Sequence, residues 1–178
     1  MWFPINFTKV RGIPINAHPG AFGAIRRHDI HTGIDLYASE RDWVFAIENG
    51  EVIANELFTG DETTPWWNKT NCLIIKSETR YFLYGEIESN LKVGDKVVSG
   101  EKIGEIIPVL PIDKIRTDIP EHSNCMLHLE MFDESYKLED GYPFWSEFTN
   151  RPKYLLDPTP VLINILKKKY QQVNLLIL

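Results

Sequence analysis

The sequence predicts a mostly β protein, built as a single domain of antiparallel strands with long loops and a short helix near the carboxyl end. Residues 73–75 form a continuous apolar run typical of a covered strand, and residues 81–87 are predicted to form a second strand paired with 72–75. Gly-Asp and Ser-Gly pairs in residues 91–105 mark the turns of a hairpin. A chain of 178 residues is long enough for one domain with a proper core, and we treat 1–178 as that domain.

The other elements follow from local signals. Gly and Pro punctuate residues 1–27, which predicts an irregular or β-rich lead-in. Residues 44–56 are predicted to be two short strands joined at Asn49-Gly50, since Asn-Gly between apolar alternations indicates a hairpin. Proline is tolerated in the first turn of a helix, so a helix is expected over 161–170. The apolar tail 171–178 is expected to pack as an edge strand or to mediate self-association.

Composition excludes some functions. The net charge is −6, which gives no electrostatic case for nucleic acid, and no stretch approaches the roughly 20 apolar residues of a membrane span. Cys72 and Cys125 allow either one bridge or two buried free thiols, and we favour free thiols. The start, Met1 to Pro4, has no basic or long apolar run. We therefore expect cytoplasmic synthesis, followed by release through lysis, as for a phage protein, or by a separate export route.

The first chemical motif is His31-Thr32-Gly33-Ile34-Asp35. A helix would also bring His31 and Asp35 onto one face, but Gly33 and the β-branched neighbours disfavour it. In an extended strand, His31, Gly33 and Asp35 share one face, and the glycine leaves space beside the two polar side chains.

The second motif is Met126-Leu127-His128-Leu129-Glu130. Alternation places Met126, His128 and Glu130 on one face, while the leucines point to the core. Together the two motifs supply two imidazoles and a carboxylate. This set suits Zn²⁺, and three protein ligands with an open fourth position are typical of a catalytic site.

The chain resembles the lysostaphin-type zinc metallopeptidases, which cut cell-wall peptide cross-bridges. The resemblance rests on the two motifs, on Val93-Gly94-Asp95-Lys96-Val97 with the following Gly-Glu-Lys-Ile-Gly, and on the closing Leu156-Asp157-Pro158. It covers about residues 20–160, leaving a lead-in (1–19) and a C-terminal helix and tail (161–178). It implies a LytM-like fold of the duplicated hybrid motif type and a zinc ion held by His31, Asp35 and His128.

Two positions depart from the family pattern. Met126 stands where the family has the first histidine of His-x-His, and Glu86 stands where it has the histidine of Tyr-x-His. Neither catalytic histidine therefore carries over. Glu86 is our candidate general base and then general acid, and Tyr84 would either assist an oxyanion or lie buried in the sheet.

We expect the substrate cleft to be bordered by loops. Trp66 and Trp67 lie in a long loop and offer large contact areas, although packing on the sheet explains them equally well. Met126 would line an apolar subsite, while His28 and His122 would reach the cleft rim.

Three functions remain open. The first is an active zinc endopeptidase acting on peptidoglycan peptides. The second is a zinc-binding pseudo-enzyme that binds wall peptide or a protein partner, and the third is a structural β domain, such as a phage component, in which the ion staples strands. The glycine-rich hairpin also resembles lipoyl and biotin carrier domains, but the sequence has no Met-Lys dipeptide to carry the cofactor, so we disfavour that reading.

Overall fold

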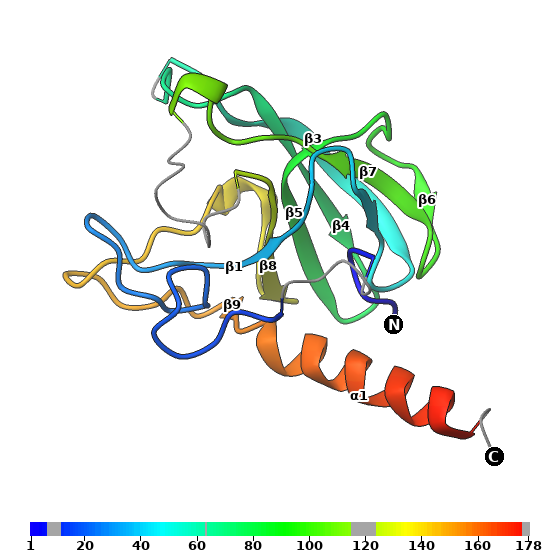
Figure 1. The fold of residues 1–178 in the computed structure, drawn as a ribbon. Coiled ribbons are helices and arrows are strands. Elements are labelled where there is room, and N and C mark those ends of the chain that lie inside the picture. The colour runs from blue at the N-terminus through cyan, green and yellow to red at the C-terminus, as the bar shows by residue number, and fades with distance from the viewer. Residues whose placement is uncertain (7–11, 63, 115–123, 176–178) are drawn as a thin grey trace.

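The structure is a computed structural model that describes residues 1–6, 12–62, 64–114 and 124–175. Its described strands are all paired antiparallel and are followed by one α-helix (Figure 1), which confirms the predicted fold class. The elements are β1 (Ile34–Tyr37), β2 (Trp43–Phe45), β3 (Gly50–Thr59), β4 (Thr70–Lys76), β5 (Arg80–Glu88), β6 (Lys96–Val97), β7 (Lys102–Ile106), β8 (Met126–Asp133), β9 (Leu155–Leu156) and α1 (Thr159–Leu175), with 3-10 turns at Ile112–Lys114 and Leu138–Asp140.

The strand order brings both chemical motifs side by side at one end of the sheet. Neighbours follow the order β1-β8-β5-β4-β3-β6, while β7 pairs with β2 and β5, and β9 pairs with β8. Strand β8 therefore lies between β1 and β5. His128 is directly opposite Asp35 on one side and Gly85 on the other.

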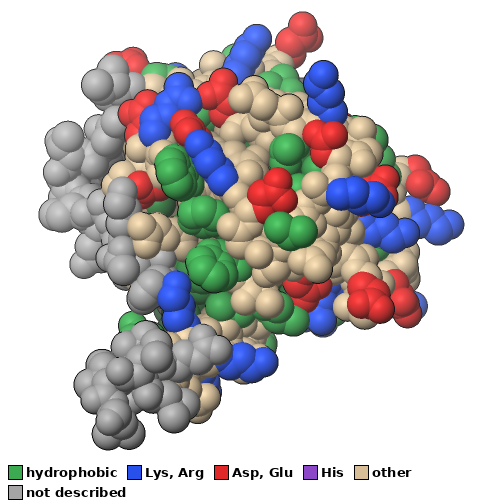
Figure 2. Space-filling model, turned by 90° about the vertical axis from the view of Figure 1, so that its right-hand side faces the viewer, with side chains coloured by type: hydrophobic (Ala, Val, Ile, Leu, Met, Phe, Trp, Pro, Cys, Tyr) green, Lys and Arg blue, Asp and Glu red, His purple; other side chains and the backbone are tan. Residues whose placement is uncertain are grey.

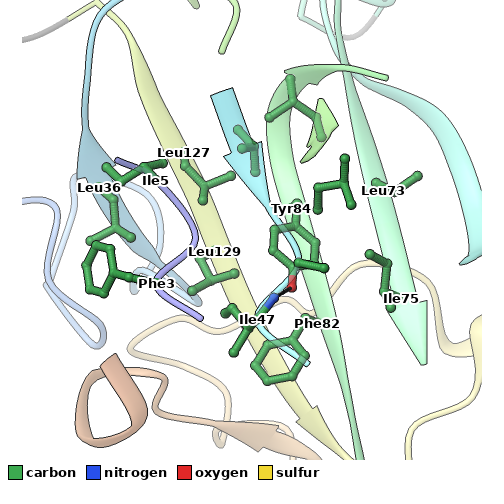
Figure 3. Packing of buried hydrophobic residues seen from close by; sticks show 14 of the residues in the cluster. Phe3, Ile5, Leu36, Ile47, Leu73, Ile75, Phe82, Tyr84, Leu127 and Leu129 are labelled. Atoms are coloured by element: carbon green, nitrogen blue, oxygen red, sulfur yellow. Dashed lines mark hydrogen bonds between the residues drawn. The ribbon is translucent and has the colours of Figure 1, made fainter. Parts of the chain in front are cut away.

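Side chains alternate along β8 between the hydrophobic core on one face of the sheet and the predicted metal site on the other face. Leu127, Leu129 and Met131 belong to the main hydrophobic core. Figure 3 shows Leu127 and Leu129 beside Phe82 and Tyr84 of β5. The intervening side chains of β8 emerge on the opposite face, which also carries a second, smaller apolar cluster. The predicted metal ligands thus lie on the face of the sheet opposite to the main hydrophobic core.

Both ends of the described chain seal the core. Phe3 and Ile5 are each 2% exposed and join it from the lead-in, which lies outside the segment resembling the peptidases. Helix α1 runs along the lower edge in Figure 1 and buries Leu162 and Ile165. Its first turn is stabilised by Asp157, whose side chain accepts a hydrogen bond from Thr159 N at 2.8 Å.

Both predicted hairpins are wrong in their pairing. Strands β2 and β3 flank Asn49-Gly50 but pair with β7 and β4 respectively, and the Asn49 side chain accepts a hydrogen bond from Ser99 N instead of closing a two-stranded turn. Likewise β6 pairs with β3, whereas β7 pairs with β2 and β5. Pairing with strands distant in the sequence therefore overrides the local turn signals.

The C-terminal prediction is partly wrong. Helix α1 begins at Thr159 and continues to Leu175, so residues 171–175 extend the helix rather than forming an edge strand. No helix in the described ranges combines the length and the apolar character needed to cross a bilayer. The described surface on the side of β6 and β7 mixes acidic and basic side chains without a large patch of one sign (Figure 2).

Candidate metal centre and cleft

The structure brings the three predicted metal ligands together. Asp35 lies in β1 and His128 in β8, while His31 lies in the loop before β1, so the expected strand over residues 31–35 is shorter than predicted. The His31 backbone is nevertheless fixed, because its N–H donates to Ala24 O and its carbonyl accepts from Gly23 N, each at 2.9 Å. All three side chains are buried.

The facing atoms of this cluster have the chemistry and spacing of a metal site. His31 Nδ1 lies 2.9 Å from Ala21 O, and since a carbonyl only accepts, Nδ1 carries the hydrogen and Nε2 presents a lone pair. That Nε2 is 3.2 Å from His128 Nδ1 and 3.2 Å from Asp35 Oδ1, and His128 Nδ1 is 2.9 Å from Asp35 Oδ1. Tetrahedral zinc with bonds near 2.0–2.1 Å separates its ligand atoms by about 3.3 Å. The residues therefore fit zinc.

Gly33 makes room for this arrangement. A Cβ atom at this position would lie 2.7 Å from His128 Cε1 and 2.7 Å from Leu129 O. Neither neighbour has freedom to retreat, because one is backbone and the other is a cluster side chain. The space predicted from the sequence is thus occupied by the His128 ring.

In the cluster, the pKa shifts favour an ionised Asp35 beside a protonated His128 and a neutral His31. Burial alone would raise the pKa of Asp35, but hydrogen bonds with His128 and His31 lower it well below its ordinary range. Burial lowers the pKa of His128, yet hydrogen bonds with Asp35 and Glu130 outweigh it and raise that pKa to about 10. For His31, burial prevails and lowers the pKa. Without a metal, a proton on His128 compensates the Asp35 carboxylate, and a cation can replace it.

Glu86 reaches the cleft through a β-bulge. Strict alternation would put it on the core face with Tyr84, but Asn71 pairs with Ile87 and Leu73 with Tyr84, so β5 has two residues, Gly85 and Glu86, where β4 has one. Glu86 has φ 63°, a left-handed conformation rare for a residue with a side chain. The bulge turns its carboxylate to the site face, where it lines the same cavity as His31 and His128.

The Glu86 carboxyl group is held in an environment that favours protonation. It is 9% exposed, and its Oε2 has no hydrogen-bond partner in the described part of the chain. Burial, reinforced by the negative charge of Asp35, raises the pKa of Glu86 to about 8. A carboxyl group with its pKa near neutrality can both accept and return a proton at physiological pH.

Tyr84 has a structural position, which replaces its interpretation as an oxyanion donor. Its ring is fully buried in the core, and its hydroxyl oxygen accepts a hydrogen bond from Ile47 N at 2.9 Å (Figure 3). The bulge after Tyr84 separates it from Glu86, so the two side chains lie on opposite faces of β5. Tyr84 therefore cannot touch a substrate in the cleft.

A cleft of about 250 Å³ opens over the metal motif. Phe58 packs on the His128 ring with 5.6 Å between centroids and meets the Tyr142 ring at 5.4 Å. Gly85 permits this, because a Cβ there would lie 2.6 Å from Phe58 Cε1. The Tyr142 hydroxyl donates to Glu56 Oε1 at 2.9 Å, which anchors the loop after β8 to β3. The aromatic residues lining the cleft are Phe58, Trp67, Tyr142, Phe144 and Trp145.

The remaining predicted cleft residues differ in where the structure places them. Trp67 is 38% exposed and lines the cleft, while Trp66, at 50%, lies outside its lining. Met126 is half-buried at the start of β8 and is also outside the lining. His28 borders a smaller neighbouring groove, and His122 falls outside the described residues. Their contacts with a substrate stay predictions.

Sequence reasoning assigned no role to four residues that complete the site. Arg26 donates to Asp35 Oδ2 at 2.6 Å and lines the cleft, and Thr32 donates to Glu130 Oε1 at 2.5 Å. Phe58 covers His128. Only Glu130 gave a usable signal, since alternation already placed it on the His128 face; loop conformation and long-range packing determine the other three.

Comparison with solved structures identifies the fold. The catalytic domain of the antimicrobial peptidase lysostaphin from Staphylococcus simulans matches with 19% identity over 80% of this chain and 88% of that domain, at a TM-score of 0.52. The crystal structure of cbpa from L. salivarius REN matches with 19% identity, covering 87% and 91% of the two chains, at 0.55. LytU matches with 21% identity, covering 85% of each chain, at 0.50.

Sequence-level comparison adds nothing to this, because no protein-family model and no curated protein matches the chain. At these identities the structural likeness establishes the architecture and leaves the chemistry to the residues themselves. The chain has the fold of the lysostaphin catalytic domain.

Proposed function

We propose that this chain is a divergent member of the lysostaphin-type zinc metallopeptidases that hydrolyses cell-wall peptides, with His31, Asp35 and His128 as the zinc ligands. The observation that carries the proposal is the bulge at Glu86, which turns a buried carboxyl group toward the three-atom cluster. It gives the site a proton carrier at the point where the family histidines are absent. The fold shared with the lysostaphin catalytic domain supports the reaction class.

Each residue has a distinct task in this reaction. A zinc ion held by His31, Asp35 and His128 would supply Lewis acidity toward the scissile carbonyl and lower the pKa of the attacking water. Glu86 would take one proton from that water as its oxygen bonds to the carbonyl carbon, and would return the proton to the leaving nitrogen as the carbon–nitrogen bond breaks. Arg26 occupies Asp35 Oδ2, which leaves Oδ1 directed at the cluster. The aromatic walls hold an extended peptide and limit the entry of bulk water.

A specific observation favours a second candidate, a zinc-binding pseudo-peptidase that captures wall peptide, a protein partner or a neighbouring component of a phage particle. Met126 offers only a thioether, which neither donates nor accepts a proton usefully. In this second candidate, Glu86 would not suffice to replace both of the family histidines, and the cleft would bind a peptide without cleaving it.

The deciding experiment combines metal content with turnover. We expect about one zinc per chain and chelator-sensitive cleavage of peptidoglycan or an oligoglycine peptide. Glu86→Gln should retain zinc and lose about 10²–10⁴-fold in kcat, the range for general acid–base catalysis. Glu134→Gln, which changes an exposed carboxylate beyond β8, is the matched control and should retain activity.

Two outcomes would reject the assignments. Full zinc occupancy in His128→Ala would show that the ligand set is wrong. Undiminished turnover in Glu86→Gln would remove Glu86 as the base, and zinc binding without cleavage of either substrate would favour the pseudo-peptidase.

A further inference from the structure

Glu130 contacts His128 on the side of the ring opposite to Asp35. It is 3% exposed on β8, and its Oε1 lies 3.1 Å from His128 Nε2, the ring nitrogen that faces away from Asp35. The same Oε1 accepts a hydrogen bond from Thr32 Oγ1 at 2.5 Å. Thr32 follows His31 directly in the chain, so this one oxygen joins the two segments that carry the histidines.

The hydrogen bond determines which nitrogen of His128 is free. Glu130 Oε1 already accepts the hydrogen of Thr32 Oγ1, and as an acceptor it needs a hydrogen on His128 Nε2, which leaves Nδ1 as the atom available to a metal. Nδ1 is also the atom that lies 3.2 Å from His31 Nε2 in the cluster. The carboxylate on the far side of the ring further raises the basicity of the ligating nitrogen.

Packing alone does not make this selection. Phe58 covers the His128 ring, and Gly33 leaves room for its edge. These are van der Waals contacts. A 180° rotation of the ring about its bond to Cβ would exchange nitrogen and carbon positions and would leave these contacts almost unchanged. The two polar contacts of the ring distinguish the orientations: Nδ1 meets Asp35 on the cluster side, and Nε2 meets Glu130 on the opposite side.

We propose that Glu130 is a positioning residue that holds His128 with Nδ1 directed at the metal, and that Thr32 holds Glu130 in place. This inference rests on the zinc site of the proposed function and adds to it a residue that does not touch the ion. Glu130 Oε2 is buried without a hydrogen-bond partner in the described residues. The carboxylate is thus buried with one of its oxygens uncompensated, while the other serves the metal motif.

The test measures zinc affinity of the full chain by competition with a chromophoric chelator. Glu130→Met keeps the side-chain length but offers only a weak acceptor, and should bind zinc about 10–100-fold more weakly. Glu130→Gln keeps an acceptor oxygen and should recover most of the affinity. Thr32→Val removes only the supporting hydroxyl, and its affinity should lie between those of wild type and Glu130→Met.

A control and a second readout separate positioning from general destabilisation. Asp29→Asn removes an exposed carboxylate of the same cleft and should leave the affinity unchanged. Long-range ¹H–¹⁵N spectra of histidine-labelled, zinc-loaded protein should show a hydrogen on His128 Nε2 in wild type and in Glu130→Gln. In Glu130→Met, the His128 signals should report a second ring state.

The outcomes distinguish this inference from the proposed function. Wild-type protein that binds no zinc would overturn the zinc site itself. Wild-type protein that binds zinc, with Glu130→Met binding equally tightly and giving the same His128 spectrum, would overturn only the positioning role. If Glu130→Met fails to fold, Thr32→Val takes its place in the test. Zinc affinity and a His128 spectrum equal to those of wild type in Thr32→Val would then overturn the proposal that Thr32 holds Glu130 in its positioning role.

Discussion

Replacing Glu86 by glutamine should stabilise the metal-free protein, and the gain should grow with pH. Glutamine has the shape of the protonated acid and remains neutral at every pH. The wild-type carboxyl group must instead ionise inside the sheet, beside Asp35, with one oxygen that finds no hydrogen-bond partner among the residues the structure describes. Because the backbone at position 86 stays in the same conformation, the substitution isolates the cost of that charge.

The magnitude follows from the pKa. Burial raises the pKa of Glu86 from 4.5 to about 8, so between these values the folded state binds a proton that the unfolded state has released. Stability therefore falls as the pH rises through this window and levels off above it. One pKa unit corresponds to about 1.4 kcal/mol, so the advantage of glutamine should rise from about 1 kcal/mol at pH 5 to about 3 kcal/mol at pH 7.

The assay is urea unfolding of chelator-treated wild type and Glu86→Gln between pH 5 and pH 9. His128 also titrates in this range, so the quantity to follow is the difference between the two proteins at each pH. Glu134→Gln supplies the control for the loss of an exposed carboxylate, and its difference from wild type should be small and flat. A flat difference for Glu86→Gln as well would refute the conclusion that Glu86 is ionised at a cost in the folded state.

Three further predictions test other parts of the site. Gly33→Ala should weaken zinc binding by at least about tenfold in a chelator competition, as a change next to a metal ligand does. The reason is that its Cβ would lie 2.7 Å from His128 Cε1, and unchanged affinity would show that the ring can move aside. Zinc binding near pH 7.5 should release at least about one proton, from His128 with its raised pKa, as calorimetry in buffers of different ionisation enthalpy would show. Tyr142→Phe should lose about 1 kcal/mol in urea unfolding, since its hydroxyl donates to Glu56, and no loss would mean that this bond does not anchor the cleft loop.

The sequence was most informative where local pattern and tertiary contact agree. His128 and Asp35 occupy facing positions of neighbouring antiparallel strands, so two short motifs sufficed to predict that these side chains lie together. The alternation of β8 also survives intact in the structure. Its apolar side requires the main core, which leaves its polar side to the cleft.

Prediction failed where long-range pairing decides the local conformation. Asn49-Gly50 can close a hairpin, but Ile5 bridges to Val44 and β2 pairs with β7, so the apolar side chains before the turn are already engaged. The bulge at Glu86 also breaks the alternation assumed for β5. Gly85 was the available signal, because a glycine inside a strand often marks a bulge or a close approach, and here it marks both.

The position of Glu86 is difficult to explain by stability alone. A left-handed conformation costs a residue with a side chain about 1–3 kcal/mol. A buried carboxyl group, one of whose oxygens has no hydrogen-bond partner in the described part of the chain, adds a second penalty at the same position. Glycine would remove the first penalty and glutamine the charge, so the fold itself does not require glutamate there. The conformation and the burial that cause these two penalties also place the Glu86 carboxyl group outside the core, in the cavity lined by His31 and His128, where it can exchange a proton. A site that used its ion only to staple strands would have no need for that group, and this difference favours catalysis over a purely structural metal.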